Sequence, residues 1–119
     1  MEVNIKEEGN YYIVSVKGEL DASSALMLDT TLQESVDNGK HHIIMDCSEL
    51  DYISSPGIGV FTSRLDEFKQ NNITLVFFGM NENVLTVFKI LGLDQLLYIV
   101  DSLKDAKKLT DGVQKDSKL

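Results

Sequence analysis

The sequence has few of the residues that characterise several large classes of protein. Its 119 residues include one cysteine, Cys47, so no disulfide can form within the chain. It has one proline, Pro56, and no segment has the composition of a flexible linker or of a repeat. Apolar runs such as residues 75–78 are far shorter than the roughly 20 residues that span a bilayer. A disulfide-rich scaffold and a membrane-spanning protein are therefore excluded.

Positive charge is also scarce. Lysine and arginine total 11 residues against 19 aspartates and glutamates, which gives a formal net charge of −8, and Arg64 is the only arginine. Affinity for nucleic acids and for anionic lipids comes largely from clustered Lys and Arg. We therefore predict no direct nucleic-acid partner and no membrane partner.

The length and composition fit one domain with one core, since 43% of the residues are hydrophobic. We predict a single domain over residues 1–110, followed by a flexible polar tail at residues 111–119. The N-terminus lacks the basic and then apolar pattern of a signal peptide. With only one cysteine as well, we expect a cytoplasmic protein.

Strand-like and helix-like patterns alternate along the chain. Alternating apolar residues and a Gly-Asn turn predict an opening β-hairpin over residues 3–16. Helical periodicity predicts helices at residues 22–38, 56–70 and about 84–91, and a fourth from Ser102. Short apolar runs predict strands at residues 42–45, 73–78 and 96–100.

This order predicts an α/β fold with a mixed, mostly parallel sheet, an N-terminal antiparallel hairpin and about four helices. Functional sites in such sheets lie where loops leave the carboxyl ends of the strands. Three predicted loops meet there, at residues 18–21, 47–55 and 79–82. We therefore expect the functional residues in these loops.

The most unusual local sequence is residues 53–59, which hold two serines, two glycines and the proline. Ser55 fits the N-cap of the following helix, with Pro56 at its first position. Alternatively, Ser55 is a phosphorylation site, because the amides and dipole at a helix N-terminus stabilise an anion. Gly57 and Gly59 each cost about 1 kcal/mol in a helix relative to alanine. Their presence suggests that another group, or a neighbouring strand, approaches this turn closely.

Other candidate sites are weaker. Asp21 fits the N-cap of the first helix, a role that is compatible with a place beside Ser55. His41 and His42 point to opposite faces of a strand and have no metal-ligand cluster beside them. Cys47 lacks an activating base, so we predict that it lies in the core. No phosphate-binding loop or nucleophile elbow is present. We predict no enzyme activity, no cofactor and no metal.

Residues 46–59, DCSELDYISSPGIG, resemble a pattern of the STAS-domain family, in particular of its small bacterial anti-sigma factor antagonists. Two weaker matches, GELD at residues 18–21 and LGL at residues 91–93, occur in the same order as in the family. The resemblance implies that an anti-sigma factor, itself a serine kinase, phosphorylates Ser55. The unphosphorylated antagonist would bind that kinase and release sigma, and a phosphatase would reverse the modification. The family's aspartate near the phosphoserine corresponds to Asp21.

The sequence departs from the family pattern on both sides of the acceptor. Ser54 stands where the pattern has aspartate, and Pro56 stands where it has serine or threonine. Ser54 is the alternative acceptor. We expect the partner-binding surface to comprise the serine loop and the exposed side of the second helix, namely Ser54, Ser55, Gly57, Val60, Ser63, Arg64 and Glu67. The alternative function is a STAS-like scaffold that binds a protein or small ligand constitutively, without phosphorylation.

Overall fold

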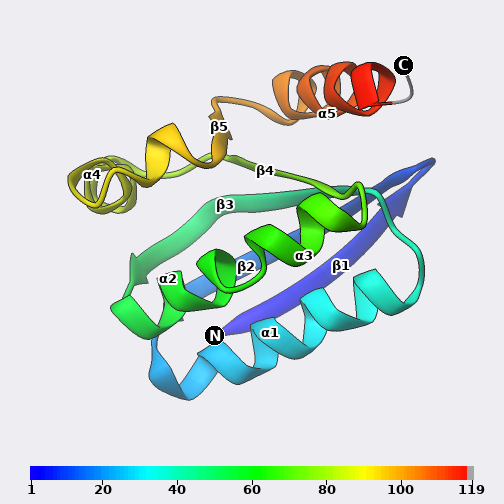
Figure 1. Ribbon diagram of the computed structural model, residues 1–119. Helices are drawn as coiled ribbons and strands as arrows, with labels where there is room; N and C mark the ends of the chain where they lie inside the picture. Colours follow the sequence, from blue (N-terminus) through cyan, green and yellow to red (C-terminus); the bar gives the residue numbers. More distant parts are fainter. Residues whose placement is uncertain (118–119) are drawn as a thin grey trace.

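The computed structural model describes residues 1–117 and contains one five-stranded sheet (Figure 1). The strands are β1 (Glu2–Glu8), β2 (Tyr11–Leu20), β3 (His42–Ile53), β4 (Thr74–Phe78) and β5 (Tyr98–Val100). The helices are α1 (Ala22–Asp37), α2 (Ser55–Thr62), α3 (Leu65–Gln70), α4 (Glu82–Ile90), the short 3₁₀ helix η1 (Leu93–Gln95) and α5 (Leu103–Ser117). Within the described residues, no helix is long and apolar enough to cross a bilayer.

The strands lie in the order β1-β2-β3-β4-β5. β1 pairs with β2 antiparallel, and all other neighbours are parallel. The predicted fold class, a mixed and mostly parallel sheet with an N-terminal antiparallel hairpin, is confirmed. Connections between parallel neighbours pass through helices, as right-handed crossover units require.

The helices cover the two faces of the sheet unequally. Alternate strand residues such as Val14, Met45 and Phe77 form one core with α1 to α4. The intervening residues, such as Ile44 and Val76, pack against α5 on the other face. Figure 1 shows α5 across the sheet from α1, α2 and α3. This alternation follows from the two-residue period of a strand that is covered on both sides.

Two elements in the middle of the chain differ markedly from the predictions. β3 does not end at Met45 but continues to Ile53, because β2 also continues and gives it a pairing partner up to Leu20. The predicted helix at residues 56–70 is two helices. The helical pattern of hydrogen bonds, from each amide to the carbonyl four residues earlier, is interrupted at Arg64. Its amide donates to the Phe61 carbonyl, three residues earlier, at 3.1 Å.

The flexible tail predicted from Asp111 is helical in the structure up to Ser117, where α5 ends. Gln114 is buried and its amide donates to Thr74 Oγ1 at 2.8 Å and to the Asn72 carbonyl at 2.9 Å. Thr110 is fully buried as well. These contacts attach residues 110–114 to the edge of the sheet. Residues 118–119 of the predicted tail lie outside the described residues.

Candidate functional site

The candidate site lies where β2 and β3 end side by side. Leu20 and Ile53 are paired in the parallel register, and the Ser54 amide donates to the Leu20 carbonyl at 2.9 Å. Asp21 and Ser54 therefore follow two adjacent strand ends. The prediction that residues 18–21 meet the serine loop is confirmed.

The third predicted loop, residues 79–82, lies elsewhere. Asn81 Nδ2 donates to the Leu50 carbonyl at 3.0 Å, and Gly79 packs against Ser48. Both contacts are with the middle of β3, because β3 continues several residues beyond β4. Residues 79–82 therefore lie beside β3 rather than beside Ser55, which corrects the expected convergence of three loops.

Ser54, and not Ser55, is the N-cap of α2. Ser54 has an extended backbone (φ −96°, ψ 171°), and its Oγ accepts a hydrogen bond from the Gly57 amide at 3.3 Å. The Ile58 amide donates to the Ser54 carbonyl at 2.9 Å, which is the first bond of the helix. Ser55 is thus the first helical residue and Pro56 the second, so the predicted cap is one residue too late. The hydrogen bond to Leu20 holds Ser54 at the strand end, and this contact determines that Ser54 rather than Ser55 is the N-cap.

The shift changes what the Ser55 hydroxyl can do. Ser55 is exposed, and its Oγ makes no hydrogen bond within residues 1–117. Ser54 is half-buried and its Oγ accepts the capping bond. Pro56 has no amide hydrogen, and the Gly57 amide is directed at Ser54 Oγ. The first turn of α2 therefore presents a free hydroxyl but few free amides.

Of the two glycines in α2, only Gly57 is closely approached. A Cβ on Gly57 would lie 2.7 Å from the Leu20 carbonyl oxygen and 2.8 Å from Leu20 Cγ. A Cβ on Gly59 would meet nothing within 4 Å. The expectation of close approach is confirmed at Gly57, where the neighbour is the end of β2, and is wrong at Gly59.

Asp21 is the N-cap of α1, as predicted. Its Oδ1 accepts hydrogen bonds from the Ser23 hydroxyl at 2.6 Å, from the Ser23 amide at 3.0 Å and from the Ser24 amide at 3.2 Å. The Asp21 amide donates in return to Ser24 Oγ at 2.9 Å, which completes a capping box. The Ser23 hydroxyl bond, and then the bonds from Ser24 and the Ser23 amide, lower the pKa of Asp21. A carboxylate that is ionised at neutral pH thus stands at the strand end beside Ser54.

Only part of the predicted partner-binding surface is exposed. Ser55 and Ser63 are exposed, while Ser54 and Glu67 are half-buried. Val60 points into the core and is 7% exposed, Gly57 is buried against Leu20, and Arg64 is 8% exposed. The expectation of an exposed helix side that includes Val60 and Arg64 is wrong, because Val60 packs in the core and Arg64 bonds to residues of α1.

Arg64 joins α3 to α1. Its Nε donates to Asp29 Oδ1 at 2.8 Å, and its Nη2 donates to the Asp29 carbonyl at 3.1 Å. Its Nη1 donates to Gln33 Oε1 at 3.0 Å and to Glu67 Oε1 at 2.9 Å. The planar guanidinium supplies donors in several directions that a lysine cannot match. This contact fixes α1 against the helices that follow Ser55.

The STAS-domain family model matches residues 2–106. The chain belongs to the STAS-domain family. It is 30% identical over 101 residues to an anti-sigma-B factor antagonist of Staphylococcus epidermidis, covering 83% of this chain and 94% of the relative. The resemblance predicted from residues 46–59 is therefore confirmed.

Two solved structures have the same fold. An anti-sigma factor antagonist from Mycobacterium paratuberculosis superposes with a TM-score of 0.84 at 17% identity, over 92% of this chain and 93% of that one. SpoIIAA of Bacillus in its phosphorylated form superposes with a TM-score of 0.70 at 15% identity, over 91% of this chain and 99% of that one. At these identities, the likeness concerns the fold alone.

The structure gives the Ser54 departure from the STAS pattern a physical meaning. Ser54 occupies the N-cap, a position where serine and aspartate are both preferred. Serine in place of the usual aspartate thus keeps the cap and removes one negative charge beside Ser55. The substitution changes local electrostatics rather than local geometry.

The prediction missed three exposed apolar residues on the elements that meet at the site. Tyr52 is 52% exposed at the end of β3, and Leu26 and Met27 are 74% and 49% exposed on α1. A signal was present in the sequence, because Leu26 and Met27 lie off the helical stripe that buries Leu28 and Leu32. Exposed apolar side chains such as these are common in protein interfaces.

The remaining candidates have structural roles. Cys47 is 1% exposed, and burial, followed by the charge of Asp46, raises its pKa to about 12, so the predicted core position is confirmed. His41 Nδ1 hydrogen-bonds to the Asn72 carbonyl at 3.0 Å, and His42 Nδ1 bonds to Thr110 Oγ1 at 2.9 Å. Residues 1–117 contain no group of three potential metal ligands.

Proposed function

We propose that this STAS domain is an anti-sigma factor antagonist that acts by partner switching. In its unphosphorylated form, it binds an anti-sigma factor that is also a serine kinase, and sigma is released. Phosphorylation of Ser55 ends this binding, and a phosphatase restores it. The names of the curated relatives support the antagonist role. The observation that carries the proposal is the exposed, unbonded Ser55 hydroxyl at the start of α2.

The structure favours Ser55 over Ser54 as the acceptor. A kinase must bring the attacking hydroxyl in line with the γ-phosphate, which requires an accessible oxygen. Ser54 Oγ is half-buried and accepts the Gly57 amide, so its modification would disrupt the cap. Ser55 Oγ is exposed and can be modified without the loss of a hydrogen bond.

We assign the docking surface to residues around Ser55 on α1, β3 and α2. Exposed Tyr52, Leu26 and Met27 supply apolar area, and Ser63 continues the surface along α2. Ser54 and Glu67 lie at its edge. Gly57, Val60 and Arg64 act from beneath the surface, because all three are buried and fix the helix that carries Ser55.

A phosphate on Ser55 would weaken binding through charge and hydration. It adds about −1.5 to −2 charge at neutral pH. Pro56 has no amide and the Gly57 amide is already used, so the first turn of α2 neutralises little of that charge. The phosphate would have to lose water in an interface lined by Tyr52 and Leu26. Each 1.4 kcal/mol of this cost lowers the affinity about tenfold.

Phosphosite mapping tests the choice of acceptor. The protein is incubated with its cognate kinase and ATP, and the modified residue is located by mass spectrometry. We expect one phosphate on Ser55 in the wild type and none in Ser55→Ala. The matched control is Ser54→Asn, which keeps a good N-cap and removes the hydroxyl. It should be phosphorylated normally. Loss of labelling in Ser54→Asn but not in Ser55→Ala would assign the acceptor to Ser54.

Binding measurements test the switch itself. Isothermal titration calorimetry with the purified kinase should give similar affinities for the wild type and Ser55→Ala. Phosphorylated protein and Ser55→Asp should bind at least tenfold more weakly. Equal affinity of the phosphorylated and unphosphorylated proteins would contradict partner switching.

The few free amides at α2 also favour a second candidate, a STAS scaffold that binds its partner constitutively. On this hypothesis, Pro56 makes the site a poor place for a phosphate. It predicts no labelling of Ser54 or Ser55 by the kinase and unchanged binding by Ser55→Asp. The two experiments above therefore separate the two functions.

A further inference from the structure

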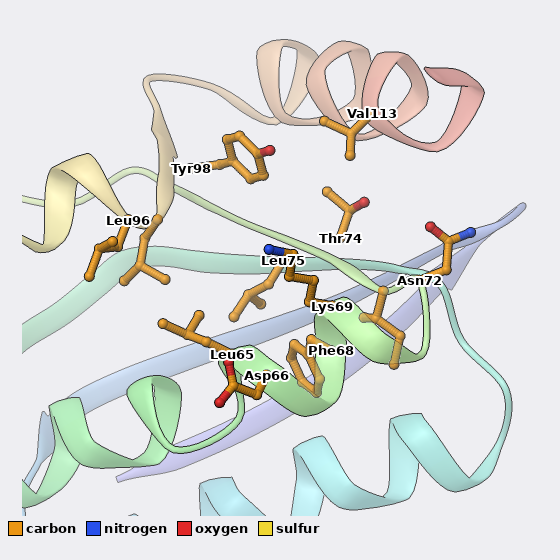
Figure 2. Close-up of a pocket in the computed structure, with 12 residues that line it drawn as sticks. Leu65, Asp66, Phe68, Lys69, Asn72, Thr74, Leu75, Leu96, Tyr98 and Val113 are labelled. Carbon is orange, nitrogen blue, oxygen red and sulfur yellow. The ribbon is translucent and has the colours of Figure 1, made fainter. Parts of the chain in front are cut away.

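A cavity of about 590 Å³ lies between α3, the β4–β5 edge and α5, away from the Ser55 site (Figure 2). This volume is within the roughly 300–1,000 Å³ of small-molecule sites. Its wall is mainly aliphatic and aromatic, and includes Leu65, Phe68, Leu75, Leu97, Tyr98 and Val113. No residue discussed so far for the switch lines it.

The cavity exists because β5 is shorter than β4. β5 pairs with Val76, Phe77 and Phe78 and leaves Thr74 and Leu75 without a neighbour in that strand. α3 and α5 stand on either side of this gap (Figure 2), and Leu96 and Leu97, which follow η1, line it from the β5 side. The result is an apolar recess in the edge of the sheet, with exposed Leu96 and Tyr98 at its rim, at 67% and 45%.

Some polar side chains in the recess already have hydrogen-bond partners in the protein, and others do not. Thr74 Oγ1 accepts from Gln114 at 2.8 Å, and Asn72 Nδ2 donates to Gln114 Oε1 at 3.3 Å. By contrast, within residues 1–117 the Lys69 ammonium has no ion pair and the Tyr98 hydroxyl makes no hydrogen bond. Figure 2 shows the Lys69 side chain extending from α3 toward Leu75 on β4, with Tyr98 on the α5 side of the recess, while the Asp66 carboxylate stays near Leu65 at the α3 wall.

From this arrangement we infer that the recess binds a small apolar carboxylic acid of the medium-chain fatty acid class. The carboxylate accepts hydrogen bonds from Lys69 Nζ and the Tyr98 hydroxyl, and the alkyl chain lies against Leu75, Leu97 and Val113. An ammonium and a hydroxyl are both donors, so they select an anionic acceptor over a cationic head. The aliphatic wall removes the chain from water.

Asp66 makes the charge argument testable in both directions. Its carboxylate lines the same recess and repels an anionic ligand, whereas Lys69 attracts it. Removing the Lys69 charge should therefore weaken binding of a carboxylate, and removing the Asp66 charge should strengthen it. Neither change should alter the binding of an uncharged ligand with the same chain.

The test is an NMR titration of the ¹⁵N-labelled 119-residue chain with decanoate, decanol and decyltrimethylammonium, each below its micelle concentration. We expect saturable shifts of the Leu75, Leu97 and Val113 amides with decanoate. Decanol should bind about threefold or more weakly, since a partly exposed charge contact is worth that much, and the cation should bind more weakly still. Shifts that map to α2 or scatter over the surface would overturn the inference.

Variants complete the test. Lys69→Gln should lower decanoate affinity about threefold or more without changing decanol affinity, and Asp66→Asn should raise decanoate affinity. The matched control is Lys104→Gln, an exposed lysine on α5 that does not line the recess. Val113→Trp should fill the recess and abolish binding of both ligands, with folding checked by circular dichroism. Equal decanoate affinities of the wild type and Lys69→Gln, or equal affinities of decanoate and decanol, would refute the carboxylate assignment.

Discussion

Gly57 lies directly against Leu20, so close that a Cβ on Gly57 would stand 2.7 Å from the Leu20 carbonyl oxygen. The same carbonyl accepts the Ser54 amide at 2.9 Å. The end of β2 therefore determines where α2 begins and how near its first turn approaches the sheet. The position of the exposed Ser55 hydroxyl follows from this packing.

The Gly57 contact predicts a large difference between two glycines of one helix. Gly57→Ala should lower the free energy of unfolding by about 1–3 kcal/mol, because backbone and Leu20 must move to admit the methyl group. Gly59→Ala is the matched control and should raise it by up to about 1 kcal/mol, since its Cβ meets open space and alanine favours helix. Urea unfolding measures both. Equal effects of the two substitutions would contradict the proposed close approach.

Arg64 provides a second prediction about stability. Arg64→Ala should lower the free energy of unfolding by about 2 kcal/mol or more, because the buried guanidinium bonds to Asp29, Gln33 and Glu67. Arg64→Lys keeps the charge but loses the planar fork, so it should recover only part of the loss. Asp29→Ala, and the double variant that combines it with Arg64→Ala, complete a double-mutant cycle that measures the coupling energy of the two side chains. A coupling energy near zero between Arg64 and Asp29 would show that the contact does not stabilise α1 against α3.

The sequence allowed the sheet, its order of elements and the meeting of Asp21 with the serine loop to be predicted, because these depend on periodicity and on chain topology. The cap register could not be predicted in this way. Ser54 and Ser55 are chemically identical capping residues, and a long-range bond from Ser54 to Leu20 selects between them. The helical period of the predicted helix at residues 56–70 puts Arg64 on the face opposite its apolar residues, which predicts an exposed side chain. Its burial depends on Asp29, 35 residues earlier in the chain.

Cys47 should be unreactive in the folded protein. Its side chain is 1% exposed and burial raises its pKa to about 12, so almost no reactive thiolate forms near neutral pH. We expect the rate of modification by a disulfide reagent at about pH 8 to be at least a hundredfold lower in the native protein than in urea. In the destabilised Gly57→Ala variant, the rate should rise in proportion to the unfolded population. Rapid labelling of the native wild type would contradict the buried position.

Asp21 should make the free energy of unfolding decrease at acidic pH. Its pKa is lowered in the folded protein, first by the Ser23 hydroxyl and then by the amide and hydroxyl bonds of the cap, below the value of about 3.9 in an unfolded chain. The unfolded state therefore binds the proton more readily. The contribution of the ionised cap is complete above about pH 4 and is lost as the pH falls through the lowered pKa.

Asp21→Asn keeps a good N-cap but does not titrate. Urea unfolding between about pH 7 and pH 3 should show similar stabilities near neutrality and a steeper loss in the wild type below about pH 4. Parallel curves for the two proteins would contradict a coupled Asp21 cap.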